Sequence, residues 1–376
     1  MASDVSDEGV PLRVLTLNVF CGKFMMDDSR LSKQIQLIRE QNADVISLQE
    51  CFDVQVQKRY IEGFPDYTPI SAHQLGRHGF SILQPISNLV FKYVWPVLSS
   101  VCCVVTCCLP PRVRAIAFPW ASCNDCLGLL VLVRSSRFAV EEVTIQALTY
   151  QTVLYSYFGC VAETCFFRPR GFILATLSQR THGLPQSLGP LFPASQGPPA
   201  PRSSHGEPQH SAMRVKIACS ALAIGVAHPN RIYQVRELVR TITGNGCVPV
   251  ILCADTNADV DQPEMQEMLQ GEGGDGDVWK DALIECGRHE CSWSGDNPLT
   301  RGWLAEPDQR NDYIVYRQAV PWAESPSPSG KSSRGLHASS VLRLLSASVI
   351  FKDRQSIVSD HYGIVADFAI RRTEAV

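Results

Sequence analysis

The sequence predicts a layered α/β domain interrupted by two irregular inserts. Segments in which apolar and polar residues alternate, as in strands, are followed along the chain by segments whose apolar residues recur at helical spacing. This order is typical of α/β folds. The 376 residues are 45% hydrophobic and 19% charged, enough apolar side chains for a sizeable core, and bulk disorder is disfavoured. Residues 81–124 and 178–215 break the regular pattern.

The first regular part contains two strands separated by a helix. Residues 12–18 alternate like a strand, and residues 44–50 form a second one. Between them, Ser29 is the candidate N-cap of a helix that extends to about Gln41.

The remaining regular parts repeat this alternation. A helix is expected from Pro229 to the stop signal at Gly244, because proline suits a first helical turn. Its apolar stripe comprises Ile232, Val235, Leu238, Val239 and Ile242. Further strands are expected at 127–133, 171–176, 248–253, 313–316, 347–351 and 364–370, and further helices at 262–269 and 278–286.

The insert at 81–124 is rich in cysteine and apolar residues. Its stretch 94–109 covers about 16 residues, short of the ~20 that a membrane-spanning helix needs, so we prefer an irregular segment to membrane association. The pair Cys123 and Cys126 lacks the second half of a zinc site, which favours free thiols.

The insert at 178–215 combines seven prolines with Ser, Gly and Gln, a composition that predicts disorder. We hypothesise that both inserts are recent insertions or translated non-coding sequence, which sequencing of the mature transcript would test. Without them, residues 12–370 form one predicted domain.

The charge balance and the N-terminal sequence bear on partners and location. There are 34 Lys+Arg against 37 Asp+Glu, a net charge of −3, which argues against binding nucleic acid through the overall field. The acidic start lacks the features of a signal peptide, so the cytoplasm is the default location. No feature indicates an obligate protein partner.

Polar residues gather where predicted strands begin or end, the usual place for sites in α/β folds. They are Asn18, Glu50, Asp255, Asn257, Arg310, Asp312, Tyr313, Ser359, Asp360 and His361. Taken alone, Asn and Asp residues after a strand are typical of turns, Glu50 fits a solvated strand end, and His361 fits a hydrogen-bonded interior histidine. Together they contain the parts for phosphodiester hydrolysis: Glu50 and Asn18 suit Mg²⁺, and His361 held by Asp312 suits proton transfer.

Five motifs in this order resemble the endonuclease/exonuclease/phosphatase superfamily. They are Leu15-Thr-Leu-Asn18, Leu48-Gln-Glu50, Ala254-Asp-Thr-Asn257, Arg310-Asn-Asp-Tyr313 and Ser359-Asp-His361. The resemblance implies a two-sheet α/β sandwich of the deoxyribonuclease I type, with the site at one edge. It also implies a Mg²⁺-dependent phosphodiester hydrolase.

The resemblance also implies a role for each residue. Glu50, Asn18 and Asp360 would hold Mg²⁺. Asp255 would position or deprotonate the attacking water, and Asn257 would hold a phosphoryl oxygen. Asp312 would orient His361, which would act on the phosphate or the water. Arg310 is a candidate substrate contact, although fixing a nearby carboxylate suits it better.

One motif departs from the family pattern. The stretch Cys219-Ser-Ala-Leu222 places Ala221 where the superfamily has a catalytic histidine or tyrosine. His182 and His228 lie nearby in the sequence but not in the matching frame. Losing a positioned acid costs ~10²–10⁴ in rate, so a catalytically inactive binding module stays an alternative.

The neutral sphingomyelinase-like branch is the nearest resemblance. It is suggested by residues 171–176, by the Trp293-containing stretch Ser292-Trp-Ser-Gly-Asp-Asn-Pro298 and by residues 306–310. Trp293, Trp279 and Trp303 are candidate contacts for a lipid headgroup, with burial in the core as the alternative. A phospholipid such as sphingomyelin is therefore favoured, with peripheral membrane contact, and a nuclease or another phosphoesterase is the alternative.

Overall fold

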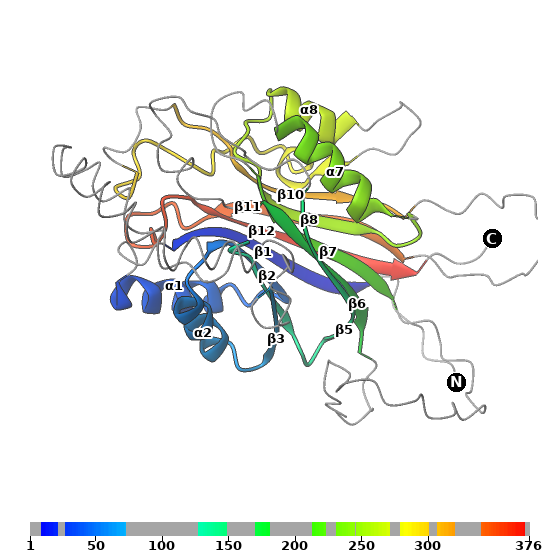
Figure 1. The fold of residues 1–376 in the computed structure, drawn as a ribbon, viewed down its shortest axis with the longest axis horizontal. Helices are drawn as coiled ribbons and strands as arrows, with labels where there is room; N and C mark the ends of the chain where they lie inside the picture. The colour runs from blue at the N-terminus through cyan, green and yellow to red at the C-terminus, as the bar shows by residue number, and fades with distance from the viewer. Residues whose placement is uncertain are drawn as a thin grey trace, which may run out of the picture.

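A computed structural model gives the structure of the chain, in which two six-stranded β-sheets form the centre of the fold (Figure 1). The structure describes residues 9–21, 27–72, 127–148, 170–180, 213–222, 231–244, 246–270, 279–300, 307–319 and 340–372. The predicted insert 81–124 lies outside these residues, and so does the insert 178–215 apart from its two ends.

The first sheet has the strand order β11-β12-β1-β2-β4-β3. Its strands are β1 (Val10–Cys21), β2 (Val45–Cys51), β3 (Tyr67–Ser71), β4 (Leu130–Arg134), β11 (Ser340–Ile350) and β12 (Gly363–Arg372). Strands β1 and β2 are parallel, whereas β12 runs antiparallel to β1. The ends of β1 and β2 therefore lie beside the start of β12.

The second sheet has the order β5-β6-β7-β8-β10-β9. Its strands are β5 (Phe138–Ala147), β6 (Gly171–Gln179), β7 (Arg214–Ala221), β8 (Val250–Asp255), β9 (Lys280–Asp281) and β10 (Asp312–Arg317). Strands β7 and β8 are parallel, and β10 is antiparallel to β8. The ends of β7 and β8 thus meet the start of β10.

The longer described helices cover the outer faces of the two sheets. They are α1 (Asp28–Glu40), α2 (Val54–Gly63), α7 (Arg231–Thr243) and α8 (Pro263–Gln270). The short α9 (Ala282–Glu285) instead adds Ala282 and Leu283 to the core between the sheets. In Figure 1, α1 and α2 lie on one side of the layered sheets, and α7 and α8 lie on the other. This arrangement confirms the predicted two-sheet α/β sandwich.

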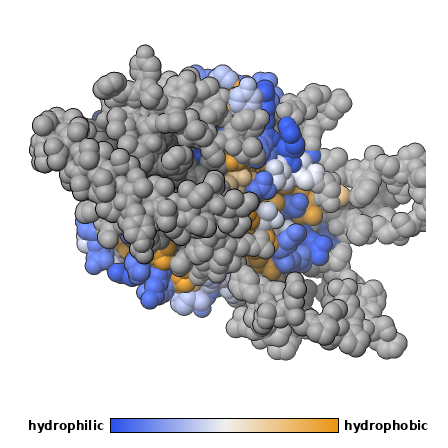
Figure 2. Space-filling view, in the orientation of Figure 1, coloured by the Kyte–Doolittle hydropathy of each residue, from blue (hydrophilic) through white to orange (hydrophobic). Residues whose placement is uncertain are grey.

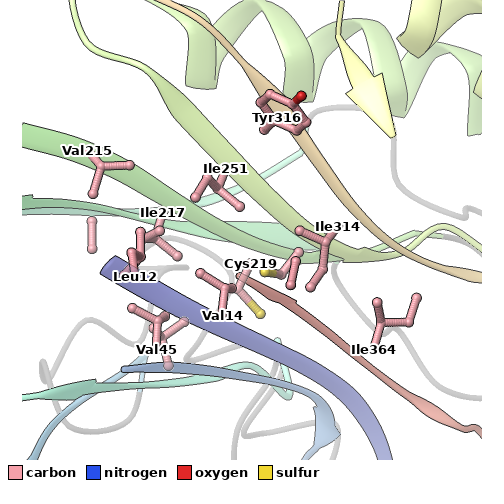
Figure 3. Packing of buried hydrophobic residues seen from close by; sticks show 14 of the residues in the cluster. Leu12, Val14, Val45, Val215, Ile217, Cys219, Ile251, Ile314, Tyr316 and Ile364 are labelled. Carbon is pink, nitrogen blue, oxygen red and sulfur yellow. The ribbon is translucent and has the colours of Figure 1, made fainter. Parts of the chain in front are cut away.

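The core between the sheets comes from strands whose alternate residues face inward (Figure 3). In β8, Ile251 and Cys253 belong to this inner cluster, whereas Val250 and Leu252 belong to the cluster shared with α7 and α8. Burying each such aliphatic side chain contributes about 1.5–3 kcal/mol. Because both faces of β8 are covered, its sequence is apolar without alternation.

Three local predictions need correction. Asp27, not Ser29, caps α1, because its side chain accepts a hydrogen bond from the Arg30 amide at 2.7 Å. Strand β8 extends through Asp255 and β10 begins at Asp312, so both acids lie within strands. The helix predicted at 278–286 is not present as one helix over the described residues 279–286, because Lys280 and Asp281 pair with β10 and Asp281 caps the short α9.

The described surface carries few large exposed apolar side chains. Those exposed in the described ranges are Tyr233 and Leu345. Figure 2 shows the described surface in that view as a mixture of hydrophilic and hydrophobic residues. Among the described residues, no helix has the length and apolar character to cross a membrane, and the stretch 94–109 lies outside them.

Candidate active site

The strand ends described above bring Asp255, Asp312 and His361 together. Asp255 is the last residue of β8 and pairs in register with Asp312, the first residue of β10. His361 comes two residues before β12. All three are buried, and one ligand atom from each lies within 4.8 Å of the others. The antiparallel register thus joins residues that are distant in sequence.

Asp312 and His361 form a buried hydrogen-bonded pair. His361 Nδ1 lies 2.7 Å from Asp312 Oδ2, the distance of a charge-assisted hydrogen bond. The second oxygen, Asp312 Oδ1, is buried and has no hydrogen-bond partner among the described residues. The predicted contact between Asp312 and His361 is present, and the role of Asp312 in orienting His361 stays a prediction.

Asn18 connects the first sheet to the carboxylates of the second. Its Nδ2 donates to Asp255 Oδ2 at 2.8 Å, and its Oδ1 accepts a hydrogen bond from the Phe20 amide at 2.9 Å. The Ser359 hydroxyl donates to the Asn18 carbonyl oxygen at 2.6 Å. Asn18 therefore holds Asp255 in place; its predicted role as a metal ligand stays a prediction.

Glu50 lies at the end of β2 and is 6% exposed. Its φ of 56° is in the left-handed region, which is uncommon for a residue other than glycine and often marks a functional turn. Its charge is one of the causes that raise the pKa of both Asp255 and Asp360. Glu50 thus acts electrostatically on the same buried group.

Burial and neighbouring charges shift the pKa of three site residues. Burial, reinforced by the charge of Asp312, raises the pKa of Asp255 to about 7. Burial likewise raises the pKa of Asp360 to about 6, against the opposing charge of His361. Burial alone would lower the pKa of His361, but Asp312 and Asp360 raise it well above its ordinary value. These two carboxylates therefore favour the protonated imidazole.

The donor set fits a hard divalent cation. Glu50, Asp255, Asp312 and Asp360 bring four carboxyl groups to a site in which His361 is the neighbouring cation. Burial is the main cause that raises the pKa of Asp255 and Asp360, and the charge of Glu50 adds to it; a cation with oxygen ligands would favour their ionised forms. Asp312 Oδ1 also lacks a partner in the described chain.

Three predicted residues lie around this group rather than in it. The Asn257 amide nitrogen donates to Asp255 Oδ1 at 3.0 Å, and its side chain donates to the Leu222 carbonyl oxygen at 3.1 Å. Arg310 is buried and pairs with Asp281 at 2.8 Å, as expected for a residue that fixes a carboxylate. Trp293 is buried too, so substrate contact by either residue stays a prediction.

Ala221 lies directly beside Asp255. It is the last residue of β7 and pairs in register with Asp255 of the parallel β8. Its side chain is buried and belongs to the core between the sheets, together with Cys219 and Cys253. The position that the resemblance assigns to a catalytic histidine is thus next to the carboxylate cluster, and it carries a methyl group.

Arg231 supports the site and was missed by the sequence reasoning. It is 1% exposed, pairs with Glu264 at 3.0 Å and donates to the Asn257 carbonyl oxygen. The sequence signal for its burial was its position in the helix. Arg231 lies four residues before Val235, so both side chains are on the buried face of α7. The predicted stripe placed Ile232 on that face, but Ile232 is only half-buried.

Comparisons with known proteins bear on the fold and the family of the chain. A search of curated proteins by sequence found no match. An endonuclease/exonuclease/phosphatase from Bacteroides vulgatus is similar in structure, with a TM-score of 0.55, 12% identity, and coverage of 96% of this chain and 100% of that one. D. rerio TDP2 complexed with a single-strand DNA product has a TM-score of 0.52 and 13% identity, covering 95% and 98%.

A conserved protein of unknown function from Enterococcus faecalis is also similar, with a TM-score of 0.52 and 12% identity, covering 96% of this chain and 100% of that one. At these identities the three likenesses establish the fold. The family itself follows from sequence, because the sequence model of the Endonuclease/Exonuclease/phosphatase family matches residues 15–361. The chain therefore belongs to the endonuclease/exonuclease/phosphatase family.

Proposed function

We propose that this chain is a Mg²⁺-dependent phosphodiester hydrolase that acts on a phospholipid such as sphingomyelin. Its family comprises hydrolases of phosphoester bonds. The observation that carries the proposal is the buried group of Asp255, Asp312 and His361 at one edge of the sandwich. Such a group combines a proton acceptor with a proton donor in a site of low dielectric.

The proton-transfer roles follow from the shifted pKa values. With a pKa of about 7, Asp255 is partly ionised at neutral pH and can accept a proton from the attacking water. Asn18 keeps its carboxylate oriented through the 2.8 Å hydrogen bond. Asp312 raises the pKa of His361 and so favours an imidazolium that would donate a hydrogen bond to a phosphoryl oxygen and stabilise the charge of the transition state.

Glu50, Asp360 and Asn18 would hold the Mg²⁺ ion. Their oxygen atoms suit a hard cation, and Glu50 lies close enough to Asp360 that its charge adds to the burial that raises the pKa of Asp360. When bound, the cation would offset charge on the phosphoryl oxygens. Asn257, whose backbone amide already contacts Asp255, would hold a phosphoryl oxygen with its side chain.

The lipid substrate is supported by sequence features. The net charge of −3 disfavours a polyanionic partner, and residues 292–298 resemble the tryptophan-containing loop of the sphingomyelinase-like branch. A lipid substrate also implies transient contact with a membrane surface. Nucleic acid remains the second candidate because D. rerio TDP2, which shares the fold, is complexed with a DNA product.

The test is a substrate panel with matched controls. Purified protein in MgCl₂ is assayed on sphingomyelin vesicles, bis(p-nitrophenyl) phosphate and plasmid DNA, beside Glu50→Ala. The control Glu40→Ala removes an exposed glutamate near the end of α1. We expect hydrolysis of sphingomyelin above that of DNA, lost in Glu50→Ala and kept in Glu40→Ala. Equal inertness of all three proteins would refute the enzymatic proposal and favour a binding module, the alternative suggested by Ala221.

A further inference from the structure

Ser292 contacts the backbone that carries Asp312. Its side chain is fully buried, and its Oγ accepts hydrogen bonds from the amides of Asn311 at 3.0 Å and Asp312 at 2.9 Å. Two amides at the start of β10 thus converge on one hydroxyl. This hydroxyl therefore fixes the position of the backbone from which the Asp312 side chain extends.

The same residue contacts the backbone beside His361. The Ser292 carbonyl oxygen accepts a hydrogen bond from the Tyr362 amide at 2.6 Å. The next residue, Trp293, forms antiparallel bridges with both Gln309 and His361. Ser292 therefore lies between the start of β10 and the residues just before β12, with its hydroxyl bound to the first and its carbonyl oxygen bound to the second.

The far end of this loop holds the backbone on the other side of His361. Asn297 Nδ2 donates to the carbonyl oxygens of Ser359 at 2.9 Å and Asp360 at 3.0 Å. The loop from Ser292 to Asn297 consequently holds His361 from both sides. Within this loop, the side-chain hydroxyl of Ser292 contacts the backbone amide of Asp312 directly.

We propose that Ser292 is a positioning residue that sets the geometry of the Asp312–His361 hydrogen bond. The 2.7 Å separation of His361 Nδ1 and Asp312 Oδ2 requires the start of β10 and the residues just before β12 to be held at a fixed distance from each other. Without the hydroxyl, two buried amides lose their acceptor and the start of β10 shifts to find another. The kinetic consequence rests on the hydrolase function proposed above, whereas the structural consequence does not.

Three variants separate positioning from general stability. Ser292→Ala removes the hydroxyl, and Ser292→Thr restores it. Ser294→Ala is the matched control, because Ser294 belongs to the same loop but its hydroxyl donates to Asp308 at 2.7 Å. If Ser292→Ala does not fold, Ser292→Cys takes its place, since a thiol is similar in size but a weaker acceptor.

Two measurements give the readout, both below the thermal midpoint of every variant and in buffers of equal pH. The first is the far-downfield proton NMR signal of the His361 Nδ1–H, which reports the short hydrogen bond without any substrate. The second is the split between kcat and KM on bis(p-nitrophenyl) phosphate in MgCl₂. A role limited to stability would move the thermal midpoint and leave both readouts in place.

We expect Ser292→Ala to lose the downfield signal and to lower kcat about 10²-fold, as a misplaced catalytic group does. We expect KM to stay within about twofold, with both properties kept in Ser292→Thr and Ser294→Ala. A Ser292→Ala variant that keeps the signal of the Ser294→Ala control overturns the proposal, as does a wild type without the signal. If the wild type gives the signal but hydrolyses nothing, the hydrolase function fails and the NMR comparison still decides the role of Ser292.

Discussion

The substitution Asp312→Asn separates the charge of the buried pair from its shape. The amide keeps the size of the carboxyl group but removes the negative charge that lies 2.7 Å from His361 Nδ1. Asp312 is the main cause that raises the pKa of His361 and the second cause, after burial, that raises the pKa of Asp255. One substitution should therefore lower both pKa values.

The size of the effect follows from the contact. A hydrogen bond to a charged group contributes about 1.5–3 kcal/mol, and one pKa unit corresponds to about 1.4 kcal/mol. The pKa of His361 should thus fall by roughly one to two units. Because the imidazole would then lose its proton at a lower pH than in the wild type, the fall in kcat should grow as pH rises.

The assay is an NMR titration of the His361 ring carbons, with kcat measured on bis(p-nitrophenyl) phosphate across the same pH range. Asp66→Asn is the control, because Asp66 is exposed and makes no contact with the cluster through its side chain. An unchanged pKa of His361 in Asp312→Asn would refute the reasoning. A fall of equal size in the control would refute it as well.

Three further predictions follow from other contacts. Ala221→His places an imidazole beside Asp255, so kcat in the phosphodiesterase assay should rise ~10²–10⁴-fold. A folded Ala221→His variant with unchanged kcat would contradict the prediction. Gly128→Ala should lower the free energy of unfolding in urea by about 2–4 kcal/mol, because the φ of Gly128 is +62° and a Cβ would lie 2.3 Å from Phe52. The control Gly287→Ala, where a Cβ would meet open space, should lower the free energy of unfolding less. The raised pKa values of Asp255 and Asp360 mean that the folded protein binds more protons than the unfolded chain, so without metal the thermal midpoint should fall as pH rises from 5 to 8. Adding MgCl₂ should reduce that fall, and a midpoint that rises with pH would contradict the prediction.

The alternation of strands and helices was readable from the sequence because local patterns encode it. Buried strands such as β8 appear as short apolar runs, and strand ends appear as polar motifs. The two-sheet arrangement was not encoded in these local patterns, and it came from the resemblance of the five motifs. The core clusters on both faces of β8 explain why its run is apolar throughout.

The connections within the site were only partly predictable. The pairing of Asp312 with His361 was expected from their chemistry, and the structure has it. The hydrogen bonds of Asn18 to Asp255 and of Ser292 to Asp312 depend on the tertiary register of separate strands, which no local pattern specifies. Helix α1 shows the same limit on a small scale, because Ser29 was the expected cap and Asp27, two residues earlier, forms it.

The most direct test of the central claim is the rate of phosphodiester hydrolysis by His361→Gln compared with His289→Gln. The two substitutions are chemically identical, but His361 is buried against Asp312 and His289 is exposed. With bis(p-nitrophenyl) phosphate and MgCl₂, His361→Gln should lose ~10²–10⁴ in kcat while His289→Gln keeps the wild-type rate. Equal rates for the two variants would show that the buried group at the sheet edge does not carry the chemistry.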